Sequence, residues 1–212
     1  GNAEWKILRQ SDGRQVWTFQ KDKIVAFDAA TGRPGTTYPV KHPTVRLLLS
    51  QGVLVASGWE GIVAKGLWDS WTSKTVNGTV EAFDPASGQL KWSMPTPGQS
   101  LVAADGCVYM LLQPPLPATE QFIAAVDIQT GKERWRVPHT KISADPNVKL
   151  ATAGLGVVVA VVEKKTKVPQ NGKVVEQVTK DIKVLSADNG EQLWEIPKVG
   201  NEWAPLVDGM LW

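Results

Sequence analysis

Side chains that could catalyse a reaction or bind a metal are few in this sequence. The two histidines, His42 and His139, lie far apart, and the one cysteine, Cys107, sits in an apolar run. None of the three belongs to the closely spaced His and Cys cluster that a metal site requires. A Gly-Leu-Gly at 154–156 opens an apolar strand instead of a helix, so it lacks the helix N-terminus that would hold a phosphate. The sequence therefore predicts no catalytic, cofactor-binding or metal-binding residue.

Length and composition indicate a folded chain that could be a single all-β domain. The chain has 212 residues, 42% of them hydrophobic, which is enough for a sizeable core. A formal net charge of +2 argues against nucleic acid as the main partner, because phosphate binders carry a concentrated basic stripe. No apolar run is long enough to span a membrane. The densest basic stretch, with Lys164, Lys165 and Lys167, is interpreted as a solvated strand edge.

Ten tryptophans are unusual for this length, and some of them follow a recurring pattern. The segment from Ala82 to Trp92 aligns without gaps on the segment from Ala125 to Trp135. One looser copy ends without a Trp, where Tyr38 is the nearest aromatic substitute, and another has Ser186 in place of Asp. The shared positions are Asp28 and Gly32; Asp84, Gly88 and Trp92; Asp127, Gly131 and Trp135; and Gly190 and Trp194.

Each position of the pattern has a physical role in a tight turn between two strands. The Asp accepts hydrogen bonds from backbone N–H groups of the turn, and the Thr or Ser adds a weaker bond of the same kind. The Gly supplies a positive φ at little steric cost. The Trp then projects from the second strand at a fixed distance from the turn. Each unit therefore contains a hairpin with a large flat anchor on its outer strand.

The Ala-x-Asp-x-x-Thr-Gly-x-x-x-Trp pattern resembles the tryptophan-docking motif of pyrroloquinoline-quinone-like β-propeller repeats. That repeat family includes eight-bladed quinoprotein alcohol dehydrogenases and non-catalytic, BamB-like lipoproteins of outer-membrane assembly. The resemblance implies an all-β fold of four-stranded antiparallel blades, with each Trp packed between neighbouring blades. It also implies an extracytoplasmic bacterial location, periplasmic or secreted.

The repeat spacing divides the chain into blades at about 1–40, 41–97, 98–140 and 141–199, and a further blade begins at 201–212. Because closed propellers typically have four to eight complete blades, we expect an incomplete part of a seven- or eight-bladed ring. The alternative is that the terminal strands complete the first blade and close a four-bladed ring.

Insertions between the second and third strands of three blades are the best indication of function. Strand directions alternate, so these connections project from one face of the disc. Blade 3 carries a Pro-rich loop, and blade 4 carries a hairpin arm, expected to pack over the neighbouring blade or to add a strand to a partner. The blade 2 insertion contains tryptophans that either cap the apolar top of the propeller or contact a partner. Its candidate contact residues are Trp59, Trp68, Asp69 and Trp71.

Two classes of function remain open at this stage. The first is a non-catalytic scaffold for protein or ligand binding, whose partner is another protein or the remaining blades of the same propeller, with no cofactor. The second, implied by the resemblance, is part of a dehydrogenase that holds pyrroloquinoline quinone and calcium, or an accessory module beside a catalytic or haem domain. Family enzymes often carry a vicinal Cys-Cys disulfide, which a chain with one cysteine does not supply.

Overall fold

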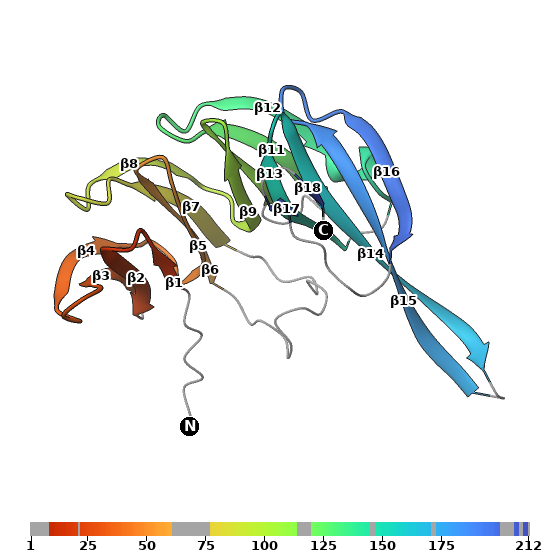
Figure 1. The fold of residues 1–212 in the computed structure, drawn as a ribbon, viewed down its shortest axis with the longest axis horizontal. Coiled ribbons are helices and arrows are strands. Elements are labelled where there is room, and N and C mark those ends of the chain that lie inside the picture. The colour runs from red at the N-terminus through yellow and green to blue at the C-terminus, as the bar shows by residue number, and fades with distance from the viewer. Residues whose placement is uncertain are drawn as a thin grey trace.

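The computed structural model describes residues 9–20, 22–60, 77–113, 120–144, 147–170 and 173–199, together with 206–207 and 210–211. These residues form four four-stranded antiparallel sheets, which follow one another along a curved row (Figure 1). A two-stranded sheet pairs β17 (Leu206–Val207) with β18 (Met210–Leu211). The predicted fold, an incomplete propeller of four-stranded antiparallel blades, is confirmed.

Within every four-stranded sheet the spatial order of the strands follows their order in the chain. The first sheet contains β1 (Arg9–Ser11), β2 (Gln15–Gln20), β3 (Lys23–Asp28) and β4 (Pro34–Pro39). The second contains β5 (Thr44–Ser50), β6 (Val53–Glu60), β7 (Asn77–Phe83) and β8 (Leu90–Met94). The third contains β9 (Gly98–Ala104), β10 (Cys107–Leu112), β11 (Phe122–Asp127) and β12 (Glu133–Pro138). The fourth contains β13 (Val148–Gly154), β14 (Val157–Gln170), β15 (Lys173–Ser186) and β16 (Gln192–Val199).

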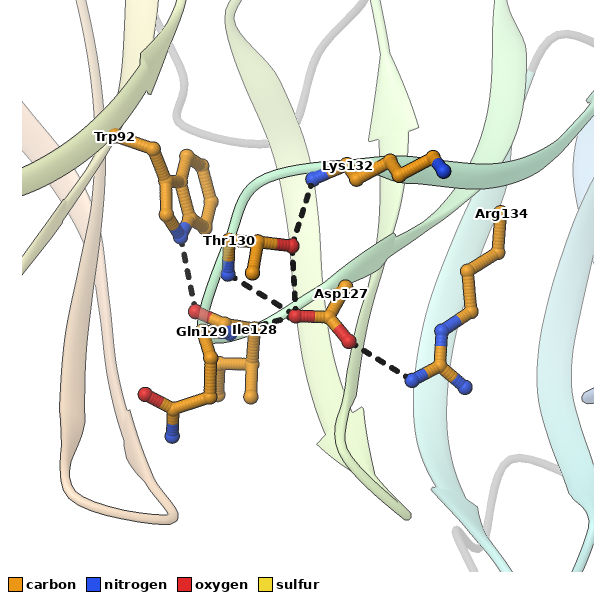
Figure 2. Close-up of polar contacts among 7 residues, drawn as sticks. All are labelled: Trp92, Asp127, Ile128, Gln129, Thr130, Lys132 and Arg134. Atoms are coloured by element: carbon orange, nitrogen blue, oxygen red, sulfur yellow. Dashed lines mark hydrogen bonds and ion pairs between the residues drawn. The ribbon is translucent and has the colours of Figure 1, made fainter.

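The turn between the third and fourth strands of a sheet has the predicted hydrogen bonds. Asp127 Oδ1 accepts the N–H groups of Gln129 and Thr130 at 3.1 and 3.0 Å and the Thr130 hydroxyl at 2.9 Å (Figure 2). Asp28 and Asp84 bind their own turns in the same way. In the fourth sheet the Ser186 hydroxyl takes over this role and accepts the Asp188 N–H at 3.2 Å.

Electrostatics reinforce the turn of the third sheet. The Arg134 guanidinium lies 2.9 Å from Asp127 Oδ2. Together with the bonds from Thr130 and the turn backbone, it lowers the pKa of Asp127 to about 2. The carboxylate is therefore ionised at neutral pH, in the form that accepts all of these hydrogen bonds.

The aromatic residue at the end of the repeat docks on the turn of the next sheet. The indole N–H of Trp92 donates to the carbonyl of Ile128 at 2.9 Å (Figure 2). A Cβ added to Gly131 would lie 2.6 Å from Cγ of Trp92, so glycine is required at that position both by its φ of +73° and by the indole ring. Two constraints therefore act on this single residue.

The same joint recurs between the third and fourth sheets. The indole N–H of Trp135 donates to the carbonyl of Ala187 at 2.7 Å. A Cβ added to Gly190 would lie 2.6 Å from Cζ3 of the indole ring. In both joints the accepting carbonyl belongs to the second residue of the turn. It follows Asp127 in the third sheet and Ser186 in the fourth.

A tyrosine forms the joint between the first and second sheets. The Tyr38 hydroxyl donates to the carbonyl of Pro85 at 2.6 Å and accepts the indole N–H of Trp17 at 2.9 Å. Pro85 follows Asp84, so the acceptor has the same place in the turn as in the other two joints. Burial raises the pKa of Tyr38, which keeps its hydroxyl protonated and able to donate. The expected substitution of tyrosine for tryptophan is thus observed.

Apolar side chains fill the space between successive sheets. Between the second and third sheets, Val53 and Val80 pack with Val108, Met110 and Val126, all with exposed fractions of 0%. Similar clusters join the first sheet to the second and the third to the fourth. Trp194 differs from the other docking tryptophans, because its side chain is 46% exposed, against 8% for Trp92. No turn among the described residues receives its indole N–H.

Candidate interaction face

Connections between the second and third strands leave each sheet at the end where the chain passes from one sheet to the next, opposite the turns that receive the docked aromatic residues. In three sheets an N–H of the second strand, or of the residue just after it, donates to a carbonyl of the preceding connection. These bonds join Trp59 to Pro43 at 3.2 Å, Gln113 to Pro97 at 3.2 Å, and Glu163 to Asn147 at 2.9 Å. The three predicted insertions therefore begin on the same side of the row of sheets.

The tryptophan-rich insertion of the second sheet is described only at its base. Trp59 lies in β6 opposite Gly78 of β7 and is partly buried. Trp68, Asp69 and Trp71 lie outside the described residues. Their role as partner contacts stays a prediction, and so does the alternative that they cap the propeller.

A polar group that the sequence analysis did not single out surrounds the base of this insertion. His42 Nδ1 lies 3.7 Å from Glu60 Oε1, and it has no hydrogen-bond partner. The buried carboxylate of Glu81 accepts the Lys41 N–H at 3.0 Å and the Thr79 hydroxyl at 3.4 Å. The sequence gives no indication of this group, because its members come from three separate strands and connections. Within the described ranges, no three His, Cys, Asp or Glu side chains lie close enough to hold a metal ion.

The hairpin of β14 and β15 is the most prominent feature of this face. Its pairing is continuous from Val157↔Ser186 to Gln170↔Lys173, and the inner part belongs to the fourth sheet. From Glu163 and Lys180 outward, the two strands extend beyond the sheet as a free arm (Figure 1). We define the arm as residues 163–170 and 173–180. Most of its side chains are exposed, so the arm does not pack over any sheet that the structure describes. Packing over a following blade concerns residues outside the described ones and stays a prediction.

A buried carboxylate fixes the base of the arm. Asp181 is 5% exposed and lies 2.5 Å from Lys164 Nζ, while its Oδ1 accepts the Lys198 N–H at 3.0 Å. Lys198 has a φ of +54°, an unfavourable conformation for a residue with a side chain. The hydrogen bond from Lys164 is the main cause that lowers the pKa of Asp181, followed by the Lys198 N–H. Asp181 therefore stabilises the point where β16 ends and the arm continues alone.

The arm is basic. Residues 163–180 contain five lysines and two glutamates, which gives them a net charge of +3. The lysines are Lys164, Lys165, Lys167, Lys173 and Lys180. Glu176 pairs with Lys165 at 3.4 Å. Neither Lys167 nor Lys173 has a carboxylate partner among the described residues.

The four sheets, the turn repeat and the docked aromatic residues define a segment of a β-propeller built from pyrroloquinoline-quinone-like repeats. A family model described as outer membrane protein assembly factor BamB matches residues 5–136 and 76–209. The chain belongs to this BamB family. No curated protein sequence matches it.

Solved structures share the fold at low sequence identity. Quinohemoprotein alcohol dehydrogenase from Comamonas testosteroni is 14% identical with a TM-score of 0.57, over 92% of this chain and 35% of the enzyme. Kuenenia stuttgartiensis hydrazine synthase is 12% identical with a TM-score of 0.55, over 83% of this chain and 49% of that one. BamB from Moraxella catarrhalis is 15% identical with a TM-score of 0.49, over 93% and 65%. The chain spans less than two thirds of each of these proteins.

The described residues contain neither a group of three His, Cys, Asp or Glu side chains that could hold a metal ion nor a helix that could cross a membrane. Because no described cluster of side chains could hold calcium, they do not fit the metal of the dehydrogenase alternative, and no step through a cofactor is derived. None of the described residues forms a helix long and apolar enough to cross a bilayer.

Proposed function

We propose that the chain is a non-catalytic propeller scaffold that binds a protein partner through the insertions on one face. The observation that carries this proposal is the arm, which extends beyond the fourth sheet with most of its side chains exposed (Figure 1). A ribbon that adds nothing to the core of its own domain costs chain entropy to order. Contact with another molecule is the use that such a projecting element supports.

The family supports an extracytoplasmic place for this scaffold, because its description is that of an assembly factor for outer membrane proteins. We therefore assign the chain to a periplasmic or secreted setting in a bacterium. The rigid joints between sheets suit this function, since a scaffold presents its contact elements in fixed relative positions. The tryptophan-rich insertion after Trp59 is the second candidate contact on the same face.

An arm-shortened variant tests the proposal. Residues 165–178 are replaced by Asn-Gly, which joins Lys164 to Thr179 through a two-residue hairpin turn. Lys164 is kept because it pairs with the buried Asp181. We expect the variant to melt within about 2 °C of the parent chain, because the removed residues contribute little to the core.

The two chains are immobilised and exposed to a cell-envelope extract of the host, and retained proteins are identified by mass spectrometry. A partner is accepted only if the purified protein binds the parent chain and binds the shortened chain at least about tenfold more weakly. A variant on the opposite face, Lys132→Glu, serves as the control and retains binding. A second variant lacks residues 61–76. If every retained protein binds both shortened chains as tightly as it binds the parent chain, the proposal is wrong.

A further inference from the structure

The two edges of the arm differ in their main-chain groups and side chains. In an antiparallel pair, successive residues point their N–H and C=O groups alternately toward the partner strand and away from it. The Glu163 N–H donates to Asn147, on the side of β14 that faces β13. Because the register has no shift along the arm, Lys165, Lys167 and Pro169 point their main-chain groups to that same side.

The same alternation assigns the outer edge of β15. Glu163 is opposite Lys180, which points toward β16 and pairs with Val199. Beyond Lys180, β16 has ended, so Val174, Glu176 and Val178 direct their N–H and C=O groups away from the hairpin without a neighbouring strand. Along the arm, both edges are therefore open in the described part of the chain.

Only one of these edges is protected against pairing. The β14 edge carries two lysines and then Pro169, which has no N–H to donate. Lysine and proline are the residues by which natural edge strands avoid further pairing. Between Lys173 and Lys180, the outward-pointing residues of β15 include neither, and Val174 and Val178 are exposed by 70% and 36% on the same face of the ribbon. The β15 edge thus has the features of a strand that accepts another strand.

A second copy of this chain is a poor occupant of that edge. Antiparallel pairing of two β15 edges centred on Glu176 would place the two glutamates directly opposite each other, which destabilises a sheet. A shift of the pairing by two residues would require either the main-chain groups of Lys180, which pairs with Val199, or residue 172, which precedes the first residue of β15. The occupant is therefore a different chain.

We propose that the outer edge of β15, from Lys173 to Val178, binds an extended acidic segment of a protein partner as an additional antiparallel strand. The inference rests on the proposed scaffold function. The segment has apolar residues opposite Val174 and Val178, an uncharged polar residue opposite Glu176, and an acidic residue opposite Lys173. The arm's net charge of +3 favours this acidic residue, and so does Lys173, which has no carboxylate partner among the described residues.

A synthetic peptide provides the direct test. The sequence Ser-Val-Thr-Thr-Thr-Val-Glu-Ser, run antiparallel to β15, places its Glu opposite Lys173. Added at millimolar concentration to the 212-residue chain, it is expected to slow amide hydrogen exchange at Val174, Glu176 and Val178 by about tenfold or more. The amides of Val175 and Gln177 already bond to β14 in the hairpin, so their exchange changes little. A peptide with Lys in place of Glu binds more weakly.

Two variants with a matched control separate strand addition from other binding modes. Glu176→Pro removes one outward N–H of the β15 edge, and Val178→Lys adds a charge to it without removing a main-chain donor. Lys167→Pro makes the equivalent change on the β14 edge. We expect the first two variants to abolish peptide protection and Lys167→Pro to retain it. Because Val178→Lys keeps the backbone intact, the test stands even if Glu176→Pro disorders the arm.

Several outcomes would overturn the inference. Absence of protection by the peptide, or protection of Lys165 and Lys167 in place of the β15 residues, contradicts strand addition at this edge. Equal protection of both edges by phosphatidylglycerol vesicles or by duplex DNA, with none by the peptide, assigns the arm to a polyanionic surface. If the arm-shortened chain loses its partner while Glu176→Pro and Val178→Lys both bind it normally, the scaffold function stands and strand addition fails.

Discussion

Removal of the docked indole of Trp92 is the sharpest test of how the sheets hold together. Trp92 is 8% exposed and donates its N–H to Ile128 of the next sheet at 2.9 Å. Trp92→Ala removes this large apolar contact and leaves a cavity above Gly131. Substitutions of this kind cost about 3–5 kcal/mol when the side chain is fully buried. Trp92→Phe keeps most of the apolar area and loses the hydrogen bond, so we expect about 1–2 kcal/mol.

Trp194 provides a control of the same residue type at the same repeat position. Its side chain is 46% exposed, and no described turn receives its indole N–H. Since apolar stabilisation scales with the area removed from water, Trp194→Ala is expected to cost no more than about 60% as much as Trp92→Ala. The difference between the two variants isolates the contribution of docking from the general effect of losing a tryptophan.

Equilibrium unfolding in urea measures both costs, followed by far-UV circular dichroism and by tryptophan fluorescence. Repeat proteins can lose cooperativity, so the two probes must give coincident transitions before a free energy of unfolding is assigned. A Trp92→Ala cost no larger than that of Trp194→Ala would refute the view that the docked indole stabilises the contact between sheets. A cost below about 1 kcal/mol would refute it as well.

Three further predictions follow from the turns and from the alternative function. Gly32→Ala should cost about 1–2 kcal/mol, because φ is +68° although nothing lies within 4 Å of the new Cβ. Gly131→Ala should cost at least about 1 kcal/mol more, because its Cβ also meets Trp92 at 2.6 Å. Equal costs in urea unfolding would contradict the steric argument. The folded-state pKa of Asp127 is lowered to about 2, so its stabilising contribution is present above its unfolded pKa of about 3.9 and is lost as pH falls through the folded value. Asp127→Asn should therefore flatten the decline of stability between about pH 4 and pH 2, and thermal melts showing an unchanged decline would refute this assignment. Pyrroloquinoline quinone with calcium should leave the melting temperature of the chain unchanged if it is a scaffold, whereas a rise at saturating cofactor would favour the dehydrogenase alternative.

The repeat could be predicted from the sequence because its determinants are local. Asp127, Thr130 and Gly131 stand within one turn, so their spacing alone specifies the hydrogen bonds and the positive φ that the structure shows. The substitution at Tyr38 could also be anticipated, because an aromatic ring near the expected position can supply both apolar area and a donor. What local pattern does not show is that Gly131 and Gly190 also serve as docking surfaces for rings from the preceding sheet.

The candidate site was less predictable, for a physical reason. A hairpin at residues 164–181 is indicated by alternating residues around a Pro-Gln-Asn-Gly turn, but its direction depends on packing with distant parts of the chain. Packing over the neighbouring blade and addition of a strand to a partner were both open from the sequence, and the described part of the chain shows an exposed ribbon. The role of Asp181 at its base was also missed, because that role depends on Lys198, a residue of another strand. Only the pairing register reveals which arm residues lie on the open edge.

The joint between the third and fourth sheets also determines how the arm is held. β15 runs inward from Lys173 at the arm tip to Ser186, and the next residue, Ala187, accepts the indole N–H of Trp135. The strand that carries the open edge is therefore anchored at its inner end by the repeat's docking contact, and near the base of the arm by Asp181. A strand held at two points loses less conformational entropy when a partner strand pairs with it than a free segment does. Loosening either anchor should therefore weaken binding at Val174 and Val178, although neither anchor touches the partner.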